Sequence, residues 1–310
     1  MKKNHYELII VGSGPAGLTA GLYAARARID HLVIEKGAAG GQILLTDWVD
    51  NYPGFPDGLS GFDLAEKMEA HARRFGLNTL TANVVSMDLS VTPKIIILED
   101  GAQLSCTSLI ICSGARPKRL NIPGEIAFTG KGVSYCATCD APFYRDLHVA
   151  VVGGGNSAVQ EASYLTKFAS RVTLIHRRDT LRATKIVQEK AFANKKIDFI
   201  LSSQVTAIEG DKGVERIQLI DNDGRKTTLA VDGIFILIGV IPNNEMLPLD
   251  LLQAEHNGFI PTDNETRTAI PGVMAAGDIR SKEMRQIVNA AGEGATAVLA
   301  AEHYLNHLTI

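Results

Sequence analysis

The chain has 310 residues, of which 45% are hydrophobic and 21% charged, and its formal net charge is −3. This length predicts two domains, and the composition is that of an ordinary globular protein rather than a disordered one. The nearly balanced charge disfavours nucleic acid or an anionic membrane surface as a partner. The longest nearly unbroken apolar run, residues 233–241, is well short of the roughly 20 residues that a membrane-spanning helix needs. No export signal precedes the first apolar segment, so we expect a cytoplasmic protein.

The first apolar segment, residues 6–11, predicts a strand that leads into the turn Gly12-Ser13-Gly14-Pro15-Ala16-Gly17. A segment rich in Ala, Leu and Arg, to about residue 28, predicts a helix. Residues 31–34 predict a second strand that ends on Glu35, 23 positions after Gly12. The order is therefore strand, glycine turn, helix and strand.

The same plan begins again at residue 147. Residues 147–152 predict a strand, which leads into the turn Gly153-Gly154-Gly155-Asn156-Ser157-Ala158, then a helix to about residue 168 and a strand over 172–175. Adding 141 to positions 12, 14, 17 and 35 gives 153, 155, 158 and 176. Two copies of one unit therefore stand in register, and His176 takes the position of Glu35.

Each copy continues with a hairpin and a final strand, in segments 94–98 and 109–112 of the first and 217–220 and 234–238 of the second. Both final strands leave through Gly-x-x-Pro, at Gly114–Pro117 and Gly239–Pro242, which we interpret as crossings between domains. The remaining segment contains a strand at 273–276 and an Ala-rich helix from about residue 288, too little for a third domain. We predict an α/β protein with two Rossmann-like, three-layer domains, the second inserted into the first. Residues 1–116 and 243–310 would form one domain and residues 117–242 the other.

A lone G-x-G-x-x-G motif is weak evidence, because glycines cluster in many tight turns. Here each copy follows a strand and opens a helix, the context in which glycines admit a pyrophosphate to the positive end of a helix. We therefore expect two dinucleotides. Ala158 replaces the third glycine, which this fingerprint allows.

The residue after the second strand distinguishes the two sites. Glu35 can accept hydrogen bonds from an adenosine ribose and would repel a 2′-phosphate, which suits FAD or NAD. The second site has His176, Arg177, Arg178 and Arg182, and guanidinium groups favour the 2′-phosphate of NADPH. The alternative is a solvated basic helix start.

A third element precedes the final helix. Gly277-Asp278 ends a strand, and small residues between 289 and 295 would let backbone N–H groups approach a flavin while Asp278 bonds its ribityl chain. The alternative for Gly277-Asp278 is a simple turn.

The pair Cys136-Ala137-Thr138-Cys139 is the other chemical feature. Zinc needs four ligands, and no second pair or group of histidines accompanies this one, so we expect no metal. Two thiols at this spacing can close a disulfide and exchange it with a substrate. Asp140 could pass a proton to a departing thiolate, or it could only form a turn with Pro142. Cys106 and Cys112 lie in or beside an apolar strand, where we expect packed free thiols.

Together these motifs resemble the low-molecular-weight thioredoxin reductases over essentially the whole chain. The resemblance implies a homodimeric flavoenzyme with FAD in the split domain and NADPH in the inserted domain. It places the following residues at FAD: Gly12, Ser13, Gly14, Pro15, Ala16, Gly17, Glu35, Lys36, Gly40, Gly41, Gln42, Asn51, Val84, Gly277, Asp278, Arg285, Gln286 and Ile287. It places these at NADPH: Gly153, Gly155, Asn156, Ser157, Ala158, His176, Arg177, Arg178, Arg182 and Gly239.

The same resemblance implies a thioredoxin-disulfide reductase, in which electrons pass from NADPH through FAD to the Cys136–Cys139 disulfide and then to thioredoxin or a thioredoxin-like protein. Cys139 would face the flavin, Cys136 would attack the substrate disulfide, and Asp140 would be the acid–base group. Because the nicotinamide and the Cys pair share the inserted domain, we also expect a hinge at the two crossings. The alternative is a flavin-dependent NAD(P)H oxidoreductase of the same fold that acts on another disulfide protein or a small acceptor.

Overall fold

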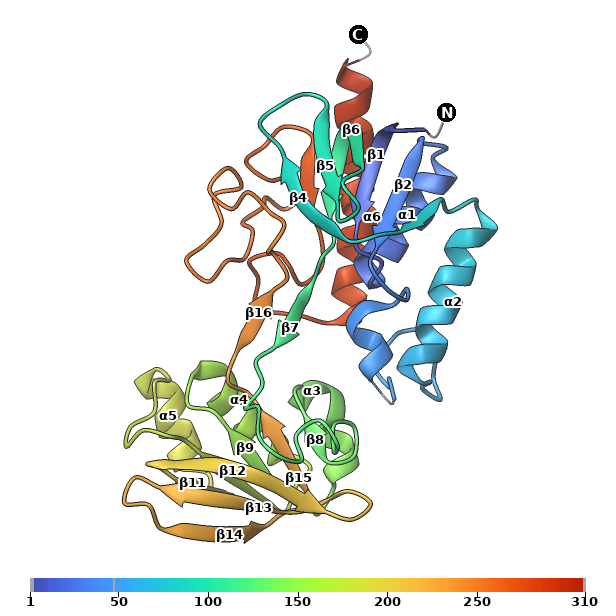
Figure 1. The fold of residues 1–310 in the computed structure, drawn as a ribbon. Coiled ribbons are helices and arrows are strands. Elements are labelled where there is room, and N and C mark those ends of the chain that lie inside the picture. Colours follow the sequence, from blue (N-terminus) through green and yellow to red (C-terminus); the bar gives the residue numbers. More distant parts are fainter. Residues whose placement is uncertain (1–2, 47, 309–310) are drawn as a thin grey trace. The chain divides into compact units, whose positions relative to one another are not determined.

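The computed structural model describes residues 3–46 and 48–308. The chain divides into two compact units, each described here by itself (Figure 1). Unit 1 comprises Met1–Arg116 and Ile241–Ile310, and unit 2 comprises Pro117–Val240. The second division falls two residues before the boundary expected from the sequence, within a strand that begins at Val240. Among the described residues, no helix is both long and apolar enough to cross a lipid bilayer.

Unit 1 is built on a seven-stranded sheet in the order β3-β2-β1-β6-β5-β4, with β17 also paired to β6. The strands β17, β6, β1, β2 and β3 run parallel, and β4 and β5 continue antiparallel from β6. The residues of β1 between Leu8 and Val11 are buried, as expected for a central parallel strand covered on both faces. The bounds are β1 His5–Val11, β2 His31–Glu35, β3 Thr79–Thr81, β4 Val84–Asp88, β5 Lys94–Leu98, β6 Gln103–Ile111 and β17 Val273–Ala275.

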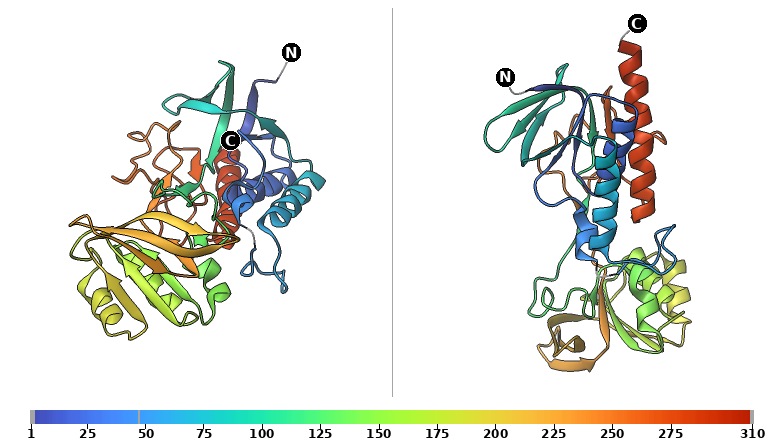
Figure 2. Two further views of the ribbon diagram at one scale, coloured as in Figure 1. Left: turned by 60° about the horizontal axis from the view of Figure 1, so that its bottom comes forward. Right: turned by 90° about the vertical axis from the view of Figure 1, so that its right-hand side faces the viewer.

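Helices cover one face of this sheet. On the other face, residues of the sheet, including β4 and β5, form a core with the segment between residues 246 and 279. Figure 2 shows the C-terminal helix α6 on the face opposite β4 and β5. Helix α1 packs closely on α6 because both are rich in Ala and Gly, and a Cβ on Gly294 would overlap the Ala16 carbonyl. The bounds are α1 Pro15–Arg26, η1 Gly41–Leu45, α2 Gly61–Arg74 and α6 Ile287–Leu308.

Unit 2 has three layers. Its central five-stranded sheet is wholly parallel, in the order β11-β10-β9-β15-β8. One face packs against α3, α4 and α5, and the other against the antiparallel sheet β12-β13-β14. The bounds are β8 Val133–Ser134, α3 Ala137–Asp140, η2 Ala141–Tyr144, β9 His148–Val152, α4 Asn156–Leu165, β10 Arg171–Ile175, α5 Lys185–Phe192, β11 Ile197–Ile200, β12 Ser203–Gly210, β13 Val214–Asp221, β14 Lys226–Ala230 and β15 Gly233–Ile236.

The two connecting segments pair with each other. Strands β7 (Ala115–Pro117) and β16 (Val240–Pro242) form a two-stranded sheet, and Asn243 N donates to Gly114 O over 3.0 Å. Each crossing also contains a glycine with positive φ, Gly114 at 70° and Gly239 at 113°. The chain therefore passes between the units through two short segments that hydrogen-bond to each other.

The expected elements differ from the structure mainly at their ends. Helix α1 ends at Arg26 rather than near residue 28, and α4 ends at Leu165 rather than near 168, because the following residues leave the helix in turns. In unit 1 the hairpin partner and the final strand are one continuous strand, β6, whereas in unit 2 they are separate strands, β14 and β15.

Candidate functional site

The first glycine turn lies between β1 and α1. Gly12 has φ +101°, its N–H donates to Ile34 O over 2.8 Å, and a Cβ there would overlap the Cys112 carbonyl oxygen. A Cβ on Gly17 would overlap the Gly12 carbonyl. Gly14 is the N-cap of α1 and makes no side-chain cap hydrogen bond. The turn therefore brings bare backbone to the positive end of a helix, the geometry that binds a pyrophosphate.

Glu35 at the end of β2 ties this turn to the following loop. Its Oε2 accepts from Ser13 N over 2.8 Å and from Ser13 Oγ over 3.0 Å, and its Oε1 accepts from Gly37 N over 3.1 Å. Gly40 N then donates to Ser13 O over 2.8 Å. Each carboxylate oxygen has two lone pairs, so Oε1 retains capacity for a ribose hydroxyl. Lys36, Gly41 and Gln42 are exposed beside this turn.

The loop after β17 reaches the same turn. A Cβ on Gly277 would lie 3.0 Å from the Cβ of Ala16, in the first turn of α1. Gly277 N donates to Glu293 Oε2 on α6 over 2.7 Å. Asn51 Nδ2 donates to Gln286 Oε1 over 3.1 Å, which draws the segment near residue 51 to the start of α6. The loop after β17 and helix α6 thus both lie against the first turn of α1, and residue 51 is joined to the start of α6.

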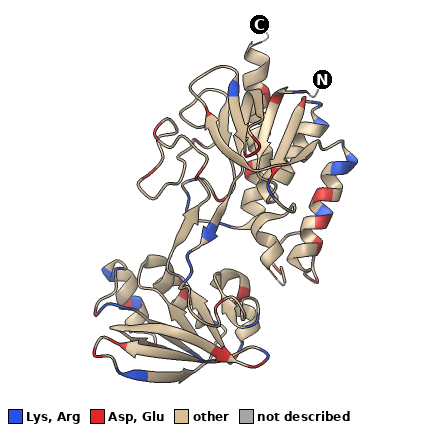
Figure 3. Ribbon diagram, viewed as in Figure 1, with Lys and Arg blue, Asp and Glu red and all other residues tan. Residues whose placement is uncertain are grey.

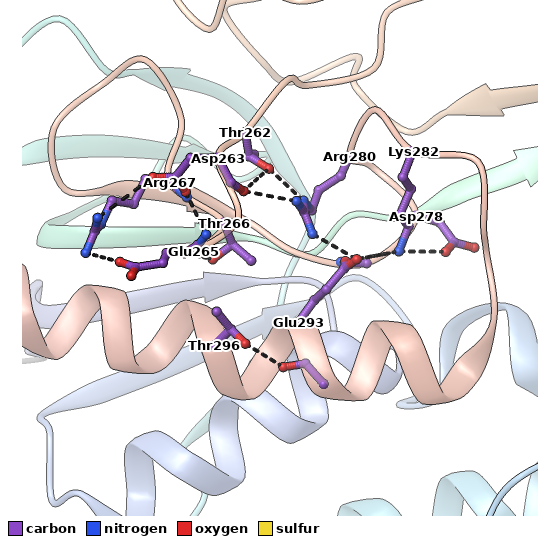
Figure 4. A network of polar contacts seen from close by, with 12 residues as sticks. Thr262, Asp263, Glu265, Thr266, Arg267, Asp278, Arg280, Lys282, Glu293 and Thr296 are labelled. Carbon is purple, nitrogen blue, oxygen red and sulfur yellow. Dashed lines mark hydrogen bonds and ion pairs between the residues drawn. The ribbon is translucent and has the colours of Figure 1, made fainter.

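A network of charged groups holds the loop after Gly277 (Figure 4). Glu293 accepts from Arg280 Nη1 over 2.8 Å and from Lys282 Nζ over 3.0 Å, and the three side chains are only 13–15% exposed. Lys282 Nζ also lies 3.8 Å from Asp278 Oδ1. Arg280 Nε donates to Thr262 Oγ1 over 2.7 Å.

Two buried polar atoms near this network are suited to bind a ligand. Asp278 Oδ1 and Arg285 Nε are both buried without a hydrogen-bond partner within the described part of the chain. Burial raises the pKa of Asp278, against the opposing effect of Lys282 and Arg285. Burial lowers the pKa of Arg285, whose guanidinium carbon lies 4.3 Å from the centre of the Phe259 ring. An uncharged polar chain with hydroxyl groups, such as the ribityl chain of FAD, would satisfy Asp278.

The other expected FAD residues lie in unit 1, at different depths. Val84 begins β4, where it pairs with Leu98 of β5, and its side chain is buried in the hydrophobic core. Ile287, the first residue of α6, is partly buried. Nothing in the structure gives Val84 a polar function.

The second glycine turn, in unit 2, repeats the first. Gly153 has φ +154°, its N–H donates to Ile175 O over 3.1 Å, and a Cβ there would overlap the Leu237 carbonyl oxygen. Gly155 is the N-cap of α4 and makes no side-chain cap hydrogen bond. Asn156 and Ser157 are exposed in the first turn of α4, whereas Ala158 is buried under it.

The segment with the arginines is fastened to this turn. The backbone N–H groups of Arg182 and Ala183 donate to Gly154 O over 2.7 and 3.0 Å, and Thr184 N donates to Asn156 Oδ1 over 2.8 Å. The side chains of Arg177, Arg178 and Arg182 are exposed. Helix α5 begins only at Lys185, so these arginines lie in a loop and not at a helix start.

His176 is buried beneath the second glycine turn. Its ring is in close contact with Gly154, only 5% of the residue is exposed, and its Nε2 is buried without a hydrogen-bond partner in the part of the chain that the structure describes. Burial, and then the charges of Arg182, Arg178 and Arg177, lower its pKa. His176 is therefore a neutral ring beneath the glycine turn.

The cysteine pair forms a disulfide that borders the short helix α3. Cys136 is the N-cap, and its N–H donates to Ser134 Oγ over 3.1 Å. Ala137 N donates to Glu161 Oε2 on α4 over 2.9 Å. Asp140 N donates to Cys136 O, so the acidic side chain directly follows the disulfide in the same turn. Cys106 and Cys112 are buried and unpaired, as expected, and burial raises the pKa of Cys106 to about 12.

Sequence reasoning missed two functional candidates, Glu161 and Glu293. Both are acidic residues within Ala-containing helices, and both accept a hydrogen bond from a backbone N–H of a predicted site segment. The available signal was a single acidic residue on the otherwise apolar side of each helix. Elsewhere, positive and negative residues are interspersed over both units (Figure 3).

Two glycine turns at helix starts, each after a parallel strand, together with a disulfide, are the features of a pyridine nucleotide-dependent disulfide oxidoreductase. The sequence model of the pyridine nucleotide-disulphide oxidoreductase family matches residues 6–294. The thioredoxin reductase of Peptoclostridium acidaminophilum is 45% identical, over 98% of both chains. That of Bacillus subtilis is 41% identical, over 98% of this chain and 96% of its own.

A solved structure supports the same family. The crystal structure of thioredoxin reductase from Streptococcus pyogenes matches with a TM-score of 0.93 and 44% identity, covering 99% of this chain and 100% of that one. The chain belongs to the thioredoxin reductases within the pyridine nucleotide-disulphide oxidoreductase family. The predicted fold class and family are therefore confirmed.

Proposed function

We propose that this chain is a thioredoxin-disulfide reductase that uses NADPH and FAD, with FAD held by unit 1 and NADPH by unit 2. The main support for this function is the Cys136–Cys139 disulfide, which lies on the same unit as the second glycine turn. When bound, the two cofactors supply hydride transfer and two-electron reduction of the disulfide. The remaining work belongs to the side chains and backbone of this chain.

In unit 1, the turn at Gly12 and the first turn of α1 bind the pyrophosphate, Glu35 accepts from the ribose, and Asp278 accepts from the ribityl chain. Among the described residues, Asp278 Oδ1 is buried without a hydrogen-bond partner, with Lys282 Nζ 3.8 Å away, which supports a ligand hydroxyl as its partner. The loop that carries it is held by Glu293.

In unit 2, the turn at Gly153 and the first turn of α4 bind the second pyrophosphate. The exposed side chains of Arg177, Arg178 and Arg182 bind the 2′-phosphate, which gives the preference for NADPH over NADH. His176 packs against Gly154 as a neutral ring, so the positive charge at this site comes from the arginines.

The reduced pair then carries out thiol–disulfide exchange. The Cys136 thiolate attacks one sulfur of the substrate disulfide, whose S–S bond breaks as the mixed disulfide forms. The Cys139 thiolate next displaces the substrate from Cys136, which restores the Cys136–Cys139 bond and releases the substrate as a dithiol. Asp140 holds the proton exchanged with the sulfur of Cys139.

The substrate is thioredoxin or a thioredoxin-like protein, and we propose a cytoplasmic homodimer. The Cys pair and the NADPH site share unit 2 and must serve the same flavin in unit 1. We therefore propose that β7 and β16 act as a hinge. A cross-link that joins the two units and leaves full NADPH-to-thioredoxin turnover would refute the hinge.

The function is tested with purified protein, which should be yellow, and whose flavin absorbance should bleach when NADPH is added. Cys136→Ser and Cys139→Ser should each abolish thioredoxin reduction, whereas Cys106→Ser, at a buried unpaired thiol, should preserve it. If Cys139→Ser leaves disulfide turnover intact, the proposal is wrong. A flavoprotein that reduces only small acceptors without these thiols would be the alternative oxidoreductase.

A further inference from the structure

A partly buried carboxylate on helix α4 contacts the Cys136–Cys139 turn. Ala137 N, between the two cysteines, donates to Glu161 Oε2 over 2.9 Å. Ala137 is fully buried, and Glu161 is partly buried, on the side of α4 that faces α3. The Cys136 sulfur contacts Thr138 Oγ1 but does not cap a backbone N–H of α3, and Glu161 accepts from the backbone donor of Ala137 instead.

We propose that Glu161 is a positioning residue that holds the Cys136–Cys139 turn and, through its negative charge, disfavours the thiolate forms of the reduced pair. This inference rests on the proposed redox role of the pair. It assigns Glu161 a function in setting how strongly the dithiol gives up its electrons, in addition to its structural contact.

The surroundings of Glu161 support an electrostatic effect. Burial raises the pKa of Glu161, and the hydrogen bond from Ala137 N opposes that rise. A carboxylate removed from water is weakly screened, so its field acts on neighbouring groups more strongly than a surface charge would. The other ionisable groups of this turn are Asp140 and, in η2, Tyr144, whose pKa burial and then Asp140 raise to about 12. These two groups are acidic, so neither offsets the charge of Glu161.

The direction of the effect follows from the redox balance. Reduction breaks the Cys136–Cys139 bond, takes up two electrons and, when both sulfurs are protonated, two protons. Stabilised thiolates make a disulfide easier to reduce and its dithiol a weaker reductant. A fixed negative charge beside the pair therefore makes the dithiol a stronger reductant, as delivery of electrons to a substrate disulfide requires.

Two substitutions separate the charge from the hydrogen bond. Glu161→Gln keeps an oxygen acceptor for Ala137 N and removes the charge, whereas Glu161→Ala removes both. Glu189→Gln, at an exposed position of α5 in the same unit, is the matched control for loss of one negative charge.

The FAD-bound holoenzyme of each variant is equilibrated in mixtures of reduced and oxidised dithiothreitol, quenched, denatured and labelled with a maleimide. Mass spectrometry then distinguishes two labels, on Cys106 and Cys112, from four. For Glu161→Gln we expect the equilibrium constant for reduction to rise about tenfold, which corresponds to roughly 30 mV for a two-electron couple. We also expect the thiol pKa, measured from the rate of alkylation against pH, to fall by about one unit.

We expect the thermal midpoint and NADP⁺ affinity of Glu161→Gln to stay within error of the wild type, and Glu189→Gln to match the wild type throughout. A Glu161→Gln protein whose equilibrium constant stays within twofold of the wild type overturns the proposal, even if Glu161→Ala fails to fold. Because dithiothreitol replaces the enzymatic electron donor, this result is independent of NADPH turnover. A protein that NADPH cannot reduce would refute the proposed function and leave the effect of Glu161 measurable.

Discussion

Replacing Glu293 by Gln is the most direct test of how unit 1 holds the loop after Gly277. The carboxylate receives hydrogen bonds from Gly277 N, Arg280 and Lys282, and Gln keeps its size while removing its charge. Arg280 retains Thr262 Oγ1 and Asp263 O, whereas the one ion-pair partner that Lys282 retains among the described residues is Asp278 Oδ1 at 3.8 Å. Breaking a buried ion pair from one side costs about 3–5 kcal/mol. With the remaining contacts of Arg280, we expect a loss of about 2–3 kcal/mol in the free energy of unfolding.

For a unit of 150–250 residues each kcal/mol shifts the melting temperature by about 2–4 °C, so FAD-free Glu293→Gln should melt roughly 4–12 °C lower. The same loop carries Asp278, so FAD affinity, measured by quenching of flavin fluorescence, should also fall. Glu283→Gln removes an exposed charge from this loop and should change neither quantity.

The cost of Glu293→Gln comes from leaving buried cations without a partner, so removing a cation together with Glu293 should reduce it. Lys282→Met combined with Glu293→Met should cost less than the sum of the two single changes. A Glu293→Gln protein that melts within 1 °C of the wild type and binds FAD equally well would refute the conclusion that Glu293 holds the loop after Gly277.

Three further outcomes follow from the two turns. Gly17→Ala puts a methyl group onto the Gly12 carbonyl and should lower the free energy of unfolding by about 1–3 kcal/mol, with loss of FAD. Denaturant unfolding and flavin absorbance measure the two effects, and full flavin content would contradict the prediction. Arg177→Ala with Arg178→Ala should raise the KM for NADPH about 10–100-fold and leave that for NADH nearly unchanged; an equal rise for both would exclude a 2′-phosphate contact. His176 has a lowered pKa in the folded state, so the unfolded chain binds its proton more readily and stability should fall as the pH drops below about 6.5. His176→Gln should flatten part of that decline in thermal melts between pH 7.5 and 5, and an identical slope would show that His176 contributes nothing to it.

Much of each glycine turn was predictable because its physics is local. A strand of buried residues, a glycine that must adopt positive φ, and a helix start are adjacent in sequence, and Gly12 and Gly153 show that conformation. The residue that follows the second strand also lies against the turn in both copies, as the constant spacing of 23 predicts. The Cys-x-x-Cys pair needed only proximity in sequence to close.

Other parts of the site depend on packing between distant segments. Glu161 meets Ala137 across 24 residues and Glu293 meets Gly277 across 16, and no spacing rule specifies which helix side faces which loop. Helix α2 was also missed, although Ser60 accepts from Asp63 N and gives the Ser-x-x-Asp signal of a helix start. The outer strand β12 was missed because its partly exposed residues alternate only imperfectly.

The divergence of the two copies is clearest at the residue that ends their second strand. In unit 1, Glu35 accepts from the backbone and hydroxyl of Ser13, so a negative charge is fixed at the rim of the turn. In unit 2, the equivalent His176 packs against Gly154 as a neutral ring, and Arg177 and Arg178 follow it into solvent. The first turn is thus bordered by a negative charge and the second by the positive charges of Arg177 and Arg178, while the strand, turn and helix are alike in both units. This contrast fits the proposal that the two turns bind dinucleotides that differ at the ribose.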